Sequence, residues 1–307
     1  MSAKTFKHGL LSRRGLVSFY ATSPRLAQAC RRAAKHDKRL ARLVEIKELP
    51  HAAAASHDLG KCNPEIAKVV LSHADDEPNV LGDARARAVV SGAFHLLFTG
   101  PATHPDQVVR WMRSTNIRSE NRLHLVQVED MHSQFVAQLL GRVRVAFGET
   151  GRKGGIIDAR LVDDSLLVRG PMGRMLHVPL ESIRALTGRP RSAVRKFTID
   201  PDGSFIEWPD LDVHLGWDQF LQAVEPAEHR KAQQRTAGFN RRYGAAIRAV
   251  REQAGILQSR IEGLTERQLR RIEKGESRAT TSAIDALARA HGLDPNAYME
   301  RLAKALR

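Results

Sequence analysis

Aromatic residues are scarce in this chain: Phe, Trp and Tyr together make up 5% of 307 residues. This argues against a stacking platform for single-stranded nucleic acid or RNA. The two cysteines, Cys30 and Cys62, have neither CxxC spacing nor a disulfide framework, which is typical of a reducing cytosol. The longest apolar stretch, Ala88–Phe98, is too short to span a bilayer, and no secretory signal is recognisable. We therefore expect a soluble, cytoplasmic protein.

Several kinds of chemistry have no recognisable motif. No Ser-His-Asp order, phosphate-cradling glycine loop or dinucleotide fingerprint occurs, so we assign no catalytic residue and expect no cofactor. The net charge, by contrast, is strong at +15. Lys and Arg outnumber Asp and Glu by 22 to 14 in residues 1–150 and by 17 to 10 in residues 225–307, but residues 151–224 are neutral with 10 of each. A basic surplus at both ends indicates an anionic partner, nucleic acid first.

The segment 264–276 is the most informative part of the chain. Thr265 and Gln268 form a capping box, which predicts a helix start. Leu269 and Ile272 would face a core, and Gly275 would end the helix. The charged residues of this short helix would then point outward. That arrangement favours a DNA recognition helix over its alternative, a solvated cationic helix in an ordinary bundle.

Further helices are expected on both sides of it. The ranges are 243–254, a short 258–262, 281–291 and a last helix opened by Asp294-Pro295. Together these form a helix-turn-helix arrangement.

Residues 240–306 resemble the phage-repressor (Cro or XRE-like) helix-turn-helix family. The matching residues are Arg248, Arg251, Gly255, Gln258, Thr265 and Arg271-Ile272-Glu273-Lys274-Gly275. The resemblance implies an all-α five-helix domain, like that of lambda repressor, over residues 238–307, and double-stranded DNA as its partner. Only seven residues separate Gly255 from Gly263, which is fewer than the family pattern has, so the second helix should be clipped.

By this resemblance, three residues read bases: Glu266, Arg267 and Arg271. Five residues would lie near phosphates: Gln258, Thr265, Arg270, Lys274 and Arg278. An arginine fork can bond guanine and a glutamate can accept from the cytosine amino group, whereas cations at the rim neutralise phosphates. Glu273 shares the buried side with Ile272, so we expect it to pair with Arg251 instead of touching DNA.

In the middle segment, 156–224, apolar and polar residues alternate, and this pattern predicts a small α+β domain. Two strands would flank an Asp163-Asp164 turn, a third strand would cover 173–178, and a hairpin would join 194–199 to 204–208. Short helices are expected at 179–186 and 216–224. Residues 178–186 and 199–212 resemble a small bacterial domain family of unknown function that is found beside such helix-turn-helix domains. The resemblance implies a fold and no chemistry, so we expect a dimerisation or effector-sensing module.

Residues 1–150 read as a mostly helical domain of unknown role. Helix starts are expected at Ser23-Pro24 and Asn63-Pro64, and helices over 83–98, 104–115 and 129–148. The glycine-rich 148–155 would be the linker to the middle domain.

One motif in this region could carry chemistry. Ser56-His57-Asp58-Leu59-Gly60-Lys61 resembles the His-Asp signature of HD phosphohydrolases, an all-helical superfamily that binds one or two metals. The resemblance would add His36 to His57 and Asp58 as ligands, with His73 and either Asp83 or Asp106 completing the set. The alternative is a helix that ends at Gly60 with His57 and Asp58 on its surface.

The sequence thus predicts a DNA-binding transcriptional regulator, a repressor or autoregulator, that acts as a homodimer on a near-palindrome. Two alternatives stay open. One is a metal-dependent phosphohydrolase fused to a DNA-binding module, and the other is an antitoxin-like protein that binds a toxin and represses its own operon.

Overall fold

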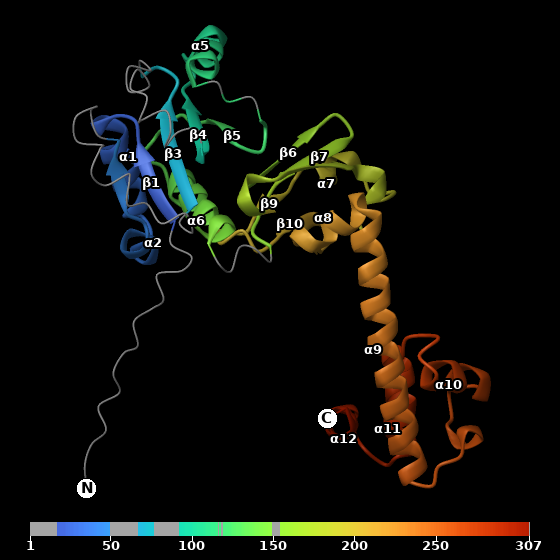
Figure 1. Cartoon of the computed structure of the whole chain (residues 1–307). Helices are drawn as coiled ribbons and strands as arrows, with labels where there is room; N and C mark the ends of the chain where they lie inside the picture. The colour runs from blue at the N-terminus through green and yellow to red at the C-terminus, as the bar shows by residue number, and fades with distance from the viewer. Residues whose placement is uncertain are drawn as a thin grey trace, which may run out of the picture. The chain divides into compact units, whose positions relative to one another are not determined.

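A computed structural model describes residues 17–49, 67–76, 92–115, 117, 119–148 and 154–306. The chain folds into two compact units, Met1–Val224 and Glu225–Arg307 (Figure 1).

The first unit contains a parallel sheet. Its strands are β1 (Val17–Ala21), β2 (Ile46–Glu48), β3 (Ala67–His73), β4 (Phe94–Thr99) and β5 (Leu123–Gln127). They lie in the order β2-β1-β3-β4-β5, and each neighbouring pair is parallel. Leu96, Leu97 and Phe98 of the interior strand β4 are all fully buried, although they alternate between the two faces. A parallel strand that is covered on both faces carries a continuous apolar run, and this is the pattern seen here.

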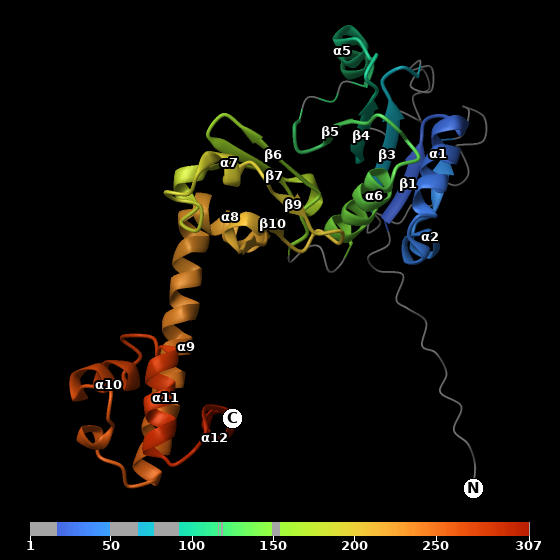
Figure 2. The same cartoon turned by 180° about the vertical axis from the view of Figure 1, so that it is seen from behind.

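Helices cover both faces of this sheet (Figures 1 and 2). They are α1 (Pro24–Ala34), α2 (Lys38–Leu43), α5 (Pro105–Thr115) and α6 (Gln134–Phe147). The side chains of α1 and α6 pack against each other and against Phe19 and Leu71 on one face. On the other face, Trp111 of α5 packs among Tyr20 and Leu97. The sheet is therefore the middle layer of three.

The fold class expected from the sequence is wrong. The sequence predicts a mostly helical N-terminal domain followed by an α+β domain and an all-α five-helix domain. The described residues instead form a mixed α/β structure with one parallel and two antiparallel sheets. The expected helix over 83–98 ends in strand β4, because an apolar run without a helical period fits a buried strand equally well. Residues 83–91 and the expected start at Asn63-Pro64 lie outside the described residues.

The rest of the first unit is built from short strands. The elements are β6 (Asp158–Val162), β7 (Ser165–Arg169), η3 (Pro171–Gly173), β8 (Met175–Pro179), η4 (Leu180–Ser182), α7 (Arg191–Val194), β9 (Thr198–Ile199), β10 (Ile206–Trp208), η5 (Pro209–Leu211), β11 (Val213–Leu215) and α8 (Trp217–Val224). The hairpin around Asp163 is present, with that residue at a left-handed φ of 50°. The helix expected at 179–186 is only a 3-10 turn. Strand β11 and helix α7 were not expected.

Buried polar contacts join these strands to the parallel sheet. His124 Nε2 of β5 lies 3.1 Å from Asp158 Oδ2 of β6. Arg169 donates to the carbonyl oxygen of Glu120 at 2.7 Å, and Arg142 of α6 donates to that of Ile157 at 2.8 Å. Segment 148–155, which the sequence analysis takes as a domain linker, therefore lies within one compact unit, and residues 149–153 of it are outside the described residues.

The second unit consists of helical segments. They are α9 (Pro226–Gln253), η6 (Gln258–Arg260), α10 (Glu266–Glu273), α11 (Thr281–Ala290) and α12 (Pro295–Ala305). Helix α9 begins far ahead of the expected residue 243, with Pro226 in its first turn. The expected helix 258–262 is a three-residue 3-10 turn. None of the described helices has both the length and the apolar character needed to cross a membrane.

Candidate nucleic-acid interface

Local sequence sets both ends of α10. Thr265 Oγ1 accepts from the backbone N–H of Gln268, and the side-chain oxygen of Gln268 accepts from the backbone N–H of Thr265. This is the capping box that the sequence predicts. Gly263 before the helix and Gly275 after it have left-handed φ values of 86° and 72°. Glycine adopts such values without the steric penalty that a β-carbon brings.

Two buried aliphatic residues and a close backbone approach hold α10 against α9. Leu269 and Ile272 are 0% and 5% exposed and belong to the core of the second unit. On the facing side of α9, Gly244 is buried, and a β-carbon there would collide with the carbonyl oxygen of Ile272. The two backbones can meet only because residue 244 has no side chain.

A buried ion pair adds a second link between the same helices. Arg251 Nε of α9 lies 2.6 Å from Glu273 Oε1 of α10, and Arg251 also donates to the carbonyl oxygen of Ile256 at 2.8 Å. The hydrogen bond to Glu273 is the largest effect on the pKa of Arg251 and raises it, so the guanidinium stays charged. The structure thus contains the pair that the sequence predicts.

Gln258 takes part in this buried arrangement. Its amide Nε2 donates to Glu273 Oε2 at 2.7 Å. One of the residues expected near phosphates therefore also fixes the carboxylate that positions α10. Its amide keeps one further N–H, which leaves the expected phosphate contact as a prediction.

The opposite side of α10 is exposed and mostly cationic. The exposed charged side chains on and just after it are Glu266, Arg267, Arg270, Arg271, Lys274, Glu276 and Arg278. Within the described residues, the side chains of Arg267, Arg270 and Lys274 have no hydrogen bond or ion pair, and Arg271 reaches only Glu276, at 4.0 Å. These cations are thus available to an external partner.

A depression of about 250 Å³ lies beside α10. It brings together three of the five residues expected near phosphates, which are Gln258, Arg270 and Lys274. Its other lining residues form two ion pairs, Arg248 with Glu252 at 2.8 Å and Arg251 with Glu273 at 2.6 Å. Thr265 and Arg278 do not line it. Arg270 and Lys274, which have no partner among the described residues, suit an anionic group such as a phosphate.

Sequence reasoning missed Gly244 as a positioning residue. A glycine inside a helical pattern lowers helix propensity, and that loss points to a close approach of another backbone. Gly244 lies within the helix that the sequence predicts, between Tyr243 and Ala245, so this signal could have been used.

Within the described residues, the structure does not support the metal site implied by the His-Asp motif. His57, Asp58, Asp83 and Cys62 lie outside the described residues. His36 Nε2 lies 2.8 Å from the carbonyl oxygen of His132, and in the described part of the chain no three His, Cys, Asp or Glu side chains are arranged to hold a metal. The described residues on both sides of 56–61 belong to a parallel sheet, which is unlike the all-helical fold that this resemblance implies.

Residues 156–225 match a family described as "Protein of unknown function (DUF2442)". This match covers the middle segment, from the start of β6 through α8, and neither of its flanks. No curated protein and no solved structure matches the chain.

Proposed function

We propose that the protein is a sequence-specific, double-stranded DNA-binding transcriptional regulator, a cytoplasmic repressor that acts on its own operon. Helix α10 enters the major groove, where Glu266, Arg267 and Arg271 meet base edges. Lys274, Arg270, Arg278, Thr265 and Gln258 lie toward the phosphates.

One observation carries the proposal. Helix α10 is anchored by the buried Arg251–Glu273 pair and by Leu269 and Ile272. Its other side presents three cations that have no partner among the described residues, which are Arg267, Arg270 and Lys274. A surface helix usually pairs its charges or spreads them, whereas a groove-reading helix needs a rigid inner side and unpaired donors outside. The surplus of 17 Lys and Arg over 10 Asp and Glu in residues 225–307 agrees with an anionic partner.

A single unit of this size covers only a few base pairs. We therefore propose that two copies bind a near-palindromic site, with half-sites about 34 Å apart or a multiple of that distance. The first unit would then serve assembly or the sensing of an effector.

Selection of bound duplex DNA from a random pool, with the full chain, tests this proposal. The expected result is one enriched motif that is repeated with two-fold symmetry at that spacing. Recovery of unenriched DNA that is lost when the salt concentration is raised would overturn sequence-specific reading, because non-specific binding is almost entirely electrostatic.

A further inference from the structure

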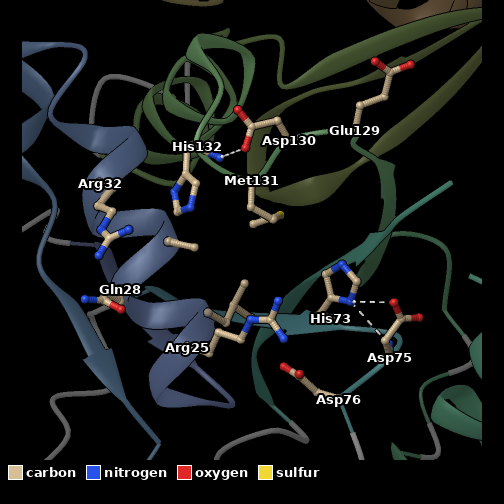
Figure 3. Close-up of a pocket in the computed structure, with 12 residues that line it drawn as sticks. Arg25, Gln28, Arg32, His73, Asp75, Asp76, Glu129, Asp130, Met131 and His132 are labelled. Atoms are coloured by element: carbon tan, nitrogen blue, oxygen red, sulfur yellow. Dashed lines mark hydrogen bonds and ion pairs between the residues drawn. The ribbon is translucent and has the colours of Figure 1, made fainter. Parts of the chain in front are cut away.

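A cavity of about 490 Å³ lies in the first unit, at the carboxyl edge of the parallel sheet (Figure 3). Its walls come from three places: α1 just after β1, the residues after β3 and the residues after β5. In an open parallel sheet with the order β2-β1-β3-β4-β5, the strand order reverses between β1 and β3. The crevice outside the carboxyl ends at such a point is where these sheets bind ligands. The volume also falls in the range of small-molecule sites.

Helix α1 presents one polar face to this cavity. Arg25, Gln28 and Arg32 line it and are spaced three and four residues apart, which puts them on the same side of the helix. The two arginines stand about 10 Å apart along the helix axis. Because an arginine side chain is long and flexible, both guanidinium groups can reach one small anion held between them.

These two arginines have no partner within the described residues, although other charged groups nearby do. Arg31 on the same helix is a contrast, since it donates to the carbonyl oxygen of Ile46 and to Glu48. It serves the fold, whereas Arg25 and Arg32 are exposed to the cavity. Helix α1 has no acidic residue in its own first turn, but the Asp76 carboxylate lies at its N-terminus, where it accepts from the N-cap residue Ser23.

Among the described residues, four carboxylates line the cavity, Asp75, Asp76, Glu129 and Asp130, and the two that follow β3 are fixed by hydrogen bonds from side chains. Asp76 Oδ2 accepts from Ser23 Oγ at 2.8 Å, and Asp75 Oδ1 accepts from Thr103 Oγ1 at 2.8 Å. Each keeps unused lone pairs, which can accept from hydroxyl groups of a ligand. The site therefore has free cations on one wall and fixed acceptors on another.

The third wall is held in place by a histidine. The carbonyl oxygen of His132 lies 2.8 Å from His36 Nε2, and Asp130 Oδ1 accepts from the backbone N–H of His132 at 2.8 Å. These hydrogen bonds hold the turn after β5 in place, so this wall of the cavity has a defined structure.

We propose that this cavity binds a small phosphomonoester on a polyhydroxylated carrier, with the phosphate held by Arg25 and Arg32 and the hydroxyl groups by Asp75 and Asp76. A sugar phosphate is the class of ligand that we favour. No Phe, Tyr or Trp is among the described residues that line the cavity, so these offer little for a nucleobase to stack on. This site is separate from α10, and its occupancy is measured without DNA.

Calorimetric titration of the full chain tests the proposal with four probes: ribose 5-phosphate, glucose 6-phosphate, AMP and inorganic phosphate. We expect at least one sugar phosphate to bind more tightly than inorganic phosphate and AMP. In the variant Arg25→Gln/Arg32→Gln, that binding should weaken about tenfold or more, because two charge-assisted bonds are lost.

The matched control is Lys35→Gln/Arg42→Gln, which removes the same charge from exposed positions outside the cavity and should bind as the wild type does. Equal weakening in both double variants would overturn the site, as would absence of binding by both sugar phosphates. Tighter binding of AMP than of both sugar phosphates would contradict the proposal that the ligand carries its phosphate on a sugar without a nucleobase. Circular dichroism should show that both variants remain folded, because none of the four side chains is buried.

Discussion

Arg251 of α9 and Glu273 of α10 form a two-point pair, with Nε 2.6 Å from Oε1 and a terminal nitrogen 3.2 Å from Oε2. Their side chains are only 8% and 4% exposed. In such a place neither charge can be hydrated, so each depends on the other. The pair therefore fixes the position of α10 along its axis, and its rotation about that axis, relative to α9.

Removing one partner of this pair should be strongly destabilising. We expect Glu273→Leu to lower the free energy of unfolding of the second unit by about 3–5 kcal/mol, because the buried Arg251 loses its two-point partner and keeps only the half-exposed Glu252, at 3.5 Å. Denaturant unfolding of the full chain measures this. The double variant Arg251→Met/Glu273→Leu should recover much of the loss. If the single and double variants were equally stable, the pair would not have the role assigned to it.

Two glycines of α9 should respond in opposite ways to alanine. Gly244→Ala should destabilise the second unit by about 1–3 kcal/mol, because the new β-carbon meets the backbone of α10. Gly238→Ala, on the same helix with nothing within 4 Å of the new atom, should stabilise by up to about 1 kcal/mol through helix propensity. Thermal unfolding separates the two effects, and a stabilising Gly244→Ala would show that α9 and α10 do not meet closely there.

The start of α10 could be predicted from sequence because its signals are local. The capping box of Thr265 and Gln268 acts within one turn, and the spacing of Leu269 and Ile272 identifies the inner face without reference to the rest of the fold. The pair of Arg251 with Glu273 followed from the same inner-face argument. The contact of Gln258 with Glu273 did not, because it depends on how the 3-10 turn approaches α10 in space.

The parallel sheet was missed because its strands carry no alternating pattern. Segments such as Val69-Val70-Leu71 and Leu96-Leu97-Phe98 are apolar at consecutive positions, since both faces are covered. Such short runs fit a buried helix equally well unless their length and β-branched content are weighed. The cavity at the sheet edge was beyond reach for the same reason, because Arg25, Asp76 and His132 meet only once the strand order is known.

The buried His124 predicts a pH dependence of stability in the first unit. Burial lowers its pKa from the ordinary 6.5 and outweighs Asp158, which raises it. At a pH just below 6.5, the histidine is therefore protonated in the unfolded chain but remains neutral in the folded one. The stabilisation is complete above the unfolded value of 6.5 and is lost as the pH falls below it.

We expect the free energy of unfolding to decrease from about pH 8 to about pH 5, and to decrease less in His124→Gln. The glutamine amide can still donate to Asp158 but does not titrate. Identical pH profiles of the two proteins, measured by denaturant unfolding, would contradict this assignment.

Lys274 should contribute to DNA binding through charge alone. We expect Lys274→Ala to weaken binding to all duplex sequences alike and to reduce the slope of log affinity against log salt concentration by about one. Lys304→Ala is the control, because it removes the same charge from α12, which packs on α9 and α11. A loss confined to the selected sequence would instead make Lys274 a base reader.

The most direct measurement compares Arg267→Ala and Arg271→Ala with Arg301→Ala, an exposed position on α12, by fluorescence anisotropy. Each variant is titrated with the selected duplex and with a scrambled one. Loss of Arg267 or Arg271 should cost about 1–3 kcal/mol on the selected duplex and relax the preference at one base pair, with a much smaller loss on the scrambled duplex. Arg301→Ala should change neither. Equal losses on both duplexes for all three variants would contradict the reading of bases by α10.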